Sequence, residues 1–290
     1  MNFNALIKEI ETRQWDVYGM EVYENGRLTH SYGDTLDSGF PIYSATKSII
    51  SIAAGIALDQ GKIELERSIL EYLPAGATGQ MSESQTAAFR EITLERLMTM
   101  SVDGFPFRPE GESYLDYSLS CPLPNVREKV FHYSNIPAYL VGVALTHAIQ
   151  EDLFCFLEKK LFKSLQIDAA VYQRCPDGYF YGASGMELTV HDLSRIGLLL
   201  YHGGIYEGTR IVSEDYVRTA SGIRQMNREG GYGYFLWKYR DGFSINGKWG
   251  QKCFILPERG LMITYLSHLE EDSSKLKTSM EKHILGIEQG

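Results

Sequence analysis

The sequence predicts an α/β (α+β) fold in which an antiparallel sheet is flanked by helices and a mainly helical domain is inserted. Three observations lead to this prediction. A strand–turn–strand pattern lies near the N-terminus, strand-like runs return near the C-terminus, and helical patterns dominate between them. We expect residues 1–65 and 188–290 to form the sheet domain and residues 66–187 to form the inserted helical domain.

The N-terminal part begins with an amphipathic pattern at residues 4–14, which indicates a short helix. Strand-like residues 17–23 and 28–32 follow, and they flank an Asn25-Gly26 pair. Asn-Gly between two such runs is the strongest short-range signal of a β-hairpin, because both residues tolerate the positive φ of a tight turn. The first two strands are therefore expected to pair with each other.

The middle of the chain combines helices with long loops. Residues 66–90 are polar and irregular, and residues 101–128 form a loop rich in Pro and Tyr, of the kind that often lines a site. Helices are expected at residues 93–100, 136–149 and 152–165. Thr93 is the expected cap of the first of these helices, and Pro137 stands in the first turn of the second, where proline is tolerated.

The C-terminal part returns to strands after one more helix. Helical spacing at residues 190–201 is preceded by Thr189 as a cap and followed by Gly203. Strand-like runs are expected at residues 232–237, 254–256 and 261–266, and a final helix at residues 270–285. A Pro257-to-Gly260 turn separates the last two strands.

Composition excludes several classes of function. The chain has 290 residues, a net charge of −9 and a pI of about 5.3, which argues against binding to nucleic acid or to anionic membranes. No apolar stretch approaches the length of a membrane span, and the N-terminus lacks the blocks of a signal peptide. The four cysteines show no paired spacing. We therefore expect a cytoplasmic protein with reduced thiols, no metal or other cofactor, and a small molecule as its partner.

A Ser44-to-Lys47 stretch stands at the head of an apolar helical run, residues 48–58. Residues three apart share a helix face, so Lys47 can reach back to Ser44 and act on it as a base. The simpler interpretation is that Ser44 only caps the helix. The same spacing recurs from Ser274 to Lys277 in a charged stretch, where it is typical of a solvated surface, so spacing alone does not establish a nucleophile.

Two further motifs carry candidate site residues. Tyr133 and Asn135 lie two apart on a loop ahead of an apolar helix, so an extended backbone would point both to one side. Lys248-Trp249-Gly250-Gln251 leads into a strand, where a cation and open backbone N–H groups could face a ligand. Taken singly, Tyr133 is more typical of a packed tyrosine and Lys248 of a surface charge.

The order of these three motifs resembles the serine β-lactamase and penicillin-binding-protein superfamily, and the Tyr-x-Asn form resembles its class C β-lactamase branch, which includes esterases and D-peptidases. Other segments also resemble that branch, and together they cover most of the chain. They are residues 97–101, 193–212, 231–234 and 250–258. The resemblance implies a β-lactamase/transpeptidase-like fold.

The resemblance also implies a role for each motif residue. Ser44 would be the nucleophile that forms an acyl-enzyme, and Lys47 and Tyr133 would move protons, with the choice of base left open. Asn135 would hold Lys47 and the substrate. The backbone N–H groups of Ser44 and Gln251 would form the oxyanion hole, where each donor is worth roughly 3 kcal/mol.

The third motif departs from the pattern of the penicillin-recognising members. Trp249 replaces the usual Thr or Ser, which argues against efficient β-lactamase activity, whereas Lys248 is retained and favours a substrate with an anionic or strongly polar group. The sequence therefore predicts a serine hydrolase that cleaves a small ester or amide. A β-lactamase or D-amino-acid peptidase using the same residues, and a non-catalytic ligand-binding relative, remain the alternatives.

Overall fold

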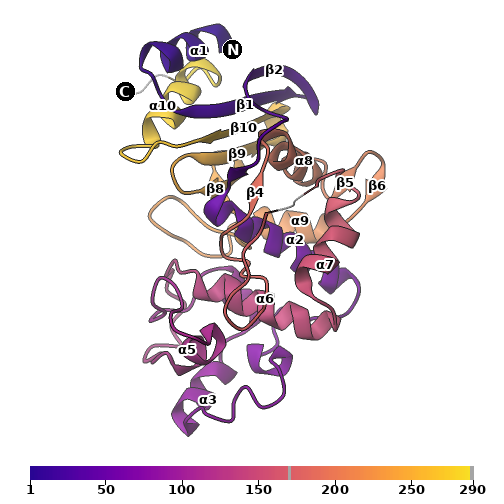
Figure 1. Ribbon diagram of the computed structural model, residues 1–290, viewed down its shortest axis with the longest axis vertical. Helices are drawn as coiled ribbons and strands as arrows, with labels where there is room; N and C mark the ends of the chain where they lie inside the picture. The colour runs from indigo at the N-terminus through magenta and orange to yellow at the C-terminus, as the bar shows by residue number, and fades with distance from the viewer. Residues whose placement is uncertain (169–170, 288–290) are drawn as a thin grey trace.

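The computed structural model describes residues 1–168 and 171–287. Its central element is a six-stranded antiparallel sheet with the strand order β2-β1-β10-β9-β8-β7, shown in Figure 1. The strands are β1 (Val17–Glu24), β2 (Arg27–Gly33), β7 (Trp237–Tyr239), β8 (Gly242–Gly247), β9 (Gln251–Leu256) and β10 (Leu261–Ser267). Strands from both parts of the chain meet where β1 pairs with β10, so the predicted fold class is confirmed.

Local signals explain the predicted hairpin. Asn25 and Gly26 have φ values of 50° and 76°, which match the left-handed conformation of a tight hairpin turn. β1 and β2 pair across this turn from Glu24 and Arg27 onward.

Helices cover both faces of the sheet. On one face, α1 (Phe3–Thr12) and α10 (Ser274–His283) lie together, as Figure 1 shows. Their apolar side chains form one core with the sheet. On the other face, α8 (Val190–Tyr201) packs against β1, β9 and β10. The larger core begins on this face and continues into the helical part of the molecule.

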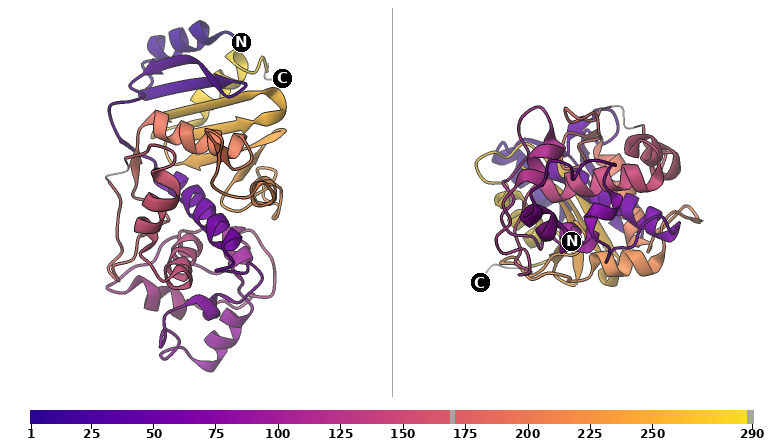
Figure 2. Two further views of the ribbon diagram at one scale, coloured as in Figure 1. Left: turned by 90° about the vertical axis from the view of Figure 1, so that its right-hand side faces the viewer. Right: turned by 90° about the horizontal axis from the view of Figure 1, so that it is seen from below.

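The helical part lies below the sheet in Figures 1 and 2. Its α-helices are α2 (Thr46–Asp59), α3 (Glu83–Arg90), α4 (Leu94–Met98), α5 (Tyr114–Ser120), α6 (Ile136–Ile149), α7 (Leu153–Leu157) and α9 (Glu214–Ser221). α6 packs against both α2 and α4. The proposed domain boundaries, at 65/66 and 187/188, stay predictions.

The short elements complete the chain. They are β3 (Phe40–Pro41) paired with β4 (Glu187–Leu188), β5 (Ile205–Tyr206) paired with β6 (Thr209–Arg210), the 3-10 turns η1 (Tyr43–Ala45), η2 (Ile69–Tyr72) and η4 (Pro257–Arg259), and the π-helical turn η3 (Glu158–Phe162).

Several element predictions hold at the residue level, and others do not. α6 spans the predicted residues, and the Thr93 and Thr189 side chains cap α4 and α8 as expected. The prediction of a strand at 232–237 is wrong for residues 232–236, because Phe235 takes a φ of 54° and Tyr232 forms only isolated bridges; strand β7 begins at Trp237. The predictions of irregular structure at 66–90 and 101–128 miss α3 and α5, which begin after the capping residues Ser82 and Ser113.

Among the described residues, no single helix has the length and apolar character to cross a membrane. The segments Ile136–Ile149 and Leu153–Phe162 reach that length only together, with a bend of 76° between them.

Candidate active site

Ser44 lies in the η1 turn, directly before α2. The preceding residue, Tyr43, has a φ of 48°, a left-handed conformation that is costly for a residue with a bulky side chain. The Tyr43 ring packs edge-on against Trp249, with ring centroids 5.1 Å apart. This strained residue sets the entry of the chain into the turn, and the Ser44 side chain lines a cavity of about 360 Å³.

Lys47 lies one turn further along and is buried. Its Nζ donates to Ser44 Oγ at 3.0 Å, to Asn135 Oδ1 at 2.7 Å and to the carbonyl oxygen of Ala183 at 2.7 Å. Removal from water disfavours the charged ammonium, and burial lowers the pKa of Lys47 to about 7. A substantial fraction of the amine is therefore neutral at physiological pH, with a lone pair available to accept a proton from Ser44.

Tyr133 approaches the same serine from the loop ahead of α6. The loop is held by backbone hydrogen bonds from His132 N to Met100 O and from Asn135 N to Phe107 O. Burial raises the pKa of Tyr133 to about 12, and a hydrogen bond with Ser44 opposes part of that rise. The Tyr133 ring also lies beside the Lys47 amine, which is 5.2 Å from the ring centroid. Tyr133 is thus a neutral hydroxyl that can donate a proton at neutral pH.

Asn135 connects Lys47 to Tyr181. Its Oδ1 accepts from Lys47, while its Nδ2 donates to the Tyr181 hydroxyl at 3.2 Å. These two bonds orient the side-chain amide and leave Lys47 directed at Ser44. The predicted residues Ser44, Lys47, Tyr133 and Asn135 therefore come together in space.

The end of β8 forms the opposite wall of the cavity. Asn246, Gly247 and Lys248 line it together with Ser44. Gly247 lies so close to the turn before Ser44 that a Cβ atom there would sit 2.3 Å from the Ile42 carbonyl oxygen. Only glycine allows this approach of strand and turn.

The third predicted motif is split by the hairpin between β8 and β9. Lys248 lines the cavity but is exposed, and its amine lies 4.0 Å from the centroid of the Trp249 ring. Trp249, Gly250 and Gln251 are not among the residues that line this cavity. The Trp249 ring packs against His268 as well as Tyr43, with centroids 4.4 Å apart in the former pair.

Gly250 and Gln251 make structural contacts in the same hairpin. Gly250 has a φ of 93°, and a Cβ atom there would lie 2.3 Å from Ser267 Oγ. The buried Gln251 side chain donates to the backbone oxygens of Lys248 and Ser267 and accepts from Ser267 N. These contacts hold the end of β8 in place.

The structure also brings to the site residues that sequence reasoning did not name, and three of them show why. Ala183 contributes only a backbone oxygen, so its side chain carries no signal. Gly247 acts through the absence of a side chain. Lys252 lines the cavity from β9, and the only signal for it is its cross-strand pairing with Asn246.

The arrangement can perform acyl transfer. It holds a hydroxyl nucleophile, a buried amine with a lowered pKa and a neutral phenol within one cavity. Over the part of the chain that the structure describes, no cluster of three or more His, Cys, Asp or Glu side chains could hold a metal ion.

Comparison with known proteins identifies the family of this chain. Residues 7–282 match the model of the Beta-lactamase family. The chain is 21% identical to the 6-aminohexanoate-dimer hydrolase of Paenarthrobacter ureafaciens over 280 residues, which cover 84% of this chain and 70% of that protein.

Solved structures share the fold at lower identity. A class C beta lactamase from Rhodobacter sphaeroides is 16% identical with a TM-score of 0.76, and the match covers 97% of this chain and 99% of that one. An octameric penicillin-binding protein homologue from Pyrococcus abyssi is also 16% identical with a TM-score of 0.69, covering 99% of this chain and 78% of that one.

Proposed function

The chain belongs to the beta-lactamase family, and from this premise we propose that it is a serine hydrolase that cleaves a small ester or amide through an acyl-enzyme on Ser44. One observation carries the proposal. The buried Lys47 Nζ, with its pKa lowered to about 7, lies 3.0 Å from Ser44 Oγ, where the neutral amine can accept the serine proton. A serine hydroxyl is a weak nucleophile until such a neighbouring base activates it.

The reaction would begin when Ser44 Oγ attacks the carbonyl carbon and its proton passes to the neutral Lys47 amine. The carbonyl oxygen becomes an oxyanion, which the backbone N–H of Ser44 would stabilise. The second donor would come from the hairpin at the end of β8, either from the predicted Gln251 N–H or from the backbone of Gly247 or Lys248, which line the cavity.

Tyr133 would complete the proton path. Its hydroxyl is hydrogen-bonded to Ser44 and stays protonated at neutral pH, so it can donate to the leaving alkoxide or amine as the bond to the acyl carbon breaks. The proton on Lys47 then returns to Tyr133. In deacylation the same groups would take a proton from the attacking water and return one to Ser44, which restores the enzyme.

The test is covalent labelling of Ser44. A fluorophosphonate probe should add to Ser44, as read by mass spectrometry of peptides, and the enzyme should hydrolyse 4-nitrophenyl hexanoate. Ser44→Ala should lose the adduct and at least about 10⁴-fold of the hydrolysis, whereas Ser274→Ala, the matched serine of the second Ser-x-x-Lys pattern, should keep both. Unchanged hydrolysis in Ser44→Ala would refute the proposal.

The names of similar proteins suggest three alternative substrates to test, each of which would be cleaved through Ser44. Nitrocefin tests a β-lactamase, a D-Ala-D-Ala peptide tests a D-amino-acid peptidase, and the linear dimer of 6-aminohexanoate tests an amidase. Turnover of one of these at a kcat/KM well above that of 4-nitrophenyl hexanoate would reassign the substrate and keep the mechanism. Ligand binding that survives Ser44→Ala, with no turnover of any substrate, would identify a non-catalytic relative.

A further inference from the structure

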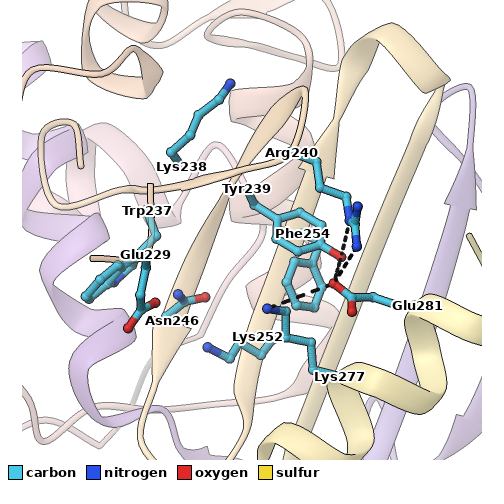
Figure 3. A pocket seen from close by; sticks show the side chains of 10 residues that line it. All are labelled: Glu229, Trp237, Lys238, Tyr239, Arg240, Asn246, Lys252, Phe254, Lys277 and Glu281. Carbon is cyan, nitrogen blue, oxygen red and sulfur yellow. Dashed lines mark hydrogen bonds and ion pairs between the residues drawn. The ribbon is translucent and has the colours of Figure 1, made fainter. Parts of the chain in front are cut away.

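The cavity at Ser44 adjoins a second cavity of about 380 Å³. The two share four lining residues, which are Glu229, Trp237, Asn246 and Lys252. Figure 3 shows the second cavity, which reaches from these residues to α10. A substrate whose acyl carbon lies at Ser44 can therefore contact residues that also line the second cavity.

The strand register places Lys252 close to the catalytic end of β8. Lys252 pairs with Asn246 across β8 and β9, and the next pair is Gly247 with Gln251. Directly paired residues project their side chains to the same face of a sheet, with Cβ atoms roughly 5 Å apart. Lys252 is thus one residue pair away from Gly247, the glycine that packs against the turn before Ser44.

Three of the six charged side chains of the second cavity, Arg240, Lys277 and Glu281, pair with one another. Glu281 accepts from the Tyr239 hydroxyl at 2.8 Å, pairs with Arg240 at 3.2 Å and lies 3.9 Å from the Lys277 amine. These interactions are drawn as dashed lines in Figure 3. Among the described residues, Glu229 and Lys238 also have no ion pair, but Glu229 is exposed and Lys238 lines only the second cavity. Two less exposed polar groups that line both cavities remain.

The first is the Lys252 amine, for which no hydrogen bond or ion pair is present among the described residues. Only longer-range charge interactions with Glu229 and Lys277 act on it, and burial lowers the pKa of Lys252 to about 8, so it remains largely cationic at neutral pH. The second is the buried Asn246 Oδ1, which has no hydrogen-bond donor among the described groups. In Figure 3 the Lys252 amine extends to the side of the cavity where Asn246 and Glu229 lie.

Leaving a half-buried cation and a buried amide oxygen unpaired costs free energy, and a ligand that pairs with both removes the cost. Lys248 does not meet this description, because it is exposed and its amine rests on the Trp249 ring. Lys252 is half-buried and lines both cavities.

We propose that Lys252 binds an anionic group of the substrate, with Asn246 accepting a hydrogen bond beside it, so that the hydrolase selects esters or amides that carry a carboxylate. This inference rests on the proposed serine hydrolase function. The carboxylate would lie where the two cavities share Trp237, Asn246 and Lys252, and an N–H or O–H group next to it would meet Asn246 Oδ1.

Two matched pairs of esters test the proposal and locate the charge. In the first pair, mono(4-nitrophenyl) adipate carries a carboxylate on its acyl group and 4-nitrophenyl hexanoate does not. In the second pair, 3-carboxyphenyl hexanoate carries a carboxylate on its leaving group, and 3-carbamoylphenyl hexanoate carries a neutral amide there. The wild-type enzyme should prefer the charged ester in at least one pair. Lys252→Met should reduce that preference in kcat/KM at least tenfold, mainly through KM, and Lys252→Arg should restore part of it.

Two other lysines serve as controls. Lys275→Met removes an exposed charge on α10 and should leave the preference within about twofold of wild type. Lys248→Met separates the two cavity lysines. A loss of preference in Lys248→Met, with none in Lys252→Met, would overturn the assignment, as would a wild-type enzyme with no preference in either pair.

A binding measurement separates this inference from the hydrolase function. Monomethyl adipate should bind to Ser44→Ala in calorimetry, and at least tenfold more weakly when Lys252→Met is added. Lys252-dependent binding by a chain that hydrolyses no ester would refute the hydrolase and support the anion site. Hydrolysis with no dependence of binding or selectivity on Lys252 would do the reverse.

Discussion

The two Ser-x-x-Lys patterns of this chain have the same spacing and different surroundings. Lys47 is buried and bonds to Ser44, Asn135 and Ala183. Lys277 keeps 42% of its side chain exposed and lies 3.9 Å from Glu281, while Ser274 bonds to Asp272. The difference teaches that spacing brings a serine and a lysine to one helix face, but burial by distant segments gives the lysine the lowered pKa of a base.

Among the variants that keep Ser44, the largest expected effect comes from removing the buried amine of Lys47. Lys47→Met should lower kcat/KM for 4-nitrophenyl hexanoate by roughly 10³-fold or more, because general-base catalysis contributes up to about 10⁴-fold. The fluorophosphonate adduct on Ser44 should form correspondingly slowly. Steady-state kinetics check this, with circular dichroism to show that the variant is folded. If kcat/KM of Lys47→Met stayed within tenfold of the wild-type value, the burial of Lys47 would give it no more catalytic importance than the exposed Lys277 has.

The pH dependence of kcat/KM gives the next test of the difference between the buried Lys47 and the exposed Lys277. Lys47 accepts a proton only when neutral, and its neutral fraction increases as pH rises through its pKa. With that pKa at about 7, kcat/KM should rise about tenfold per pH unit below 7 and level off above it.

The midpoint of that profile also decides between the two candidate bases. A profile that still rises about tenfold per pH unit at pH 11 would point to Tyr133, whose pKa burial raises to about 12. A midpoint near the ordinary lysine value of about 10.4 would mean that burial does not perturb Lys47. Stopped-flow measurement of acylation between about pH 5 and pH 11.5 distinguishes the three outcomes.

The smallest expected effect concerns the wall that faces Ser44. In Gly247→Ala the added methyl group would meet the Ile42 carbonyl at 2.3 Å and the Gln251 Cβ at 2.8 Å, so β8 must move away from the turn. The free energy of unfolding should fall by about 1–3 kcal/mol, and kcat/KM by about tenfold, since small displacements of an oxyanion donor cost rate. Urea unfolding and ester kinetics measure both.

Gly39→Ala provides the matched control for that substitution. Its nearest neighbour would be at an ordinary contact distance of 3.6 Å and its φ is not left-handed, so stability and kcat/KM should stay close to wild type. Equal losses in both variants would show that the close approach of β8 to the turn has no special importance.

Much of the fold could be predicted because its signals are local. Asn25-Gly26 predicts the hairpin, Thr93 and Thr189 predict helix starts, and apolar spacing predicts α6. The errors arise where tertiary contacts override local pattern. The segment at 232–237 has the aromatic content of a strand, yet Phe235 donates its N–H to Met98 O of α4 and leaves the sheet.

The site was predictable to the extent that side chains carry its chemistry. Ser44, Lys47, Tyr133 and Asn135 stand in recognisable motifs, and the structure brings them together. Lys252 could not be found in this way, because its orientation depends on the pairing of β8 with β9. The backbone oxygen of Ala183 is equally invisible in a sequence.

The sequence by itself determined the family, the order of the motifs and the placement of a lysine one helical turn after a serine, because these depend on residue identity and short-range geometry. The tertiary structure alone decided that the Lys47 amine is removed from solvent and that the Lys277 amine is not. Its partners Asn135 and Ala183 stand 88 and 136 residues away, and only folding brings them to exclude solvent from the amine. Desolvation is a property of the assembled cavity, so the chemistry of Ser44 is created by contacts that no local pattern contains.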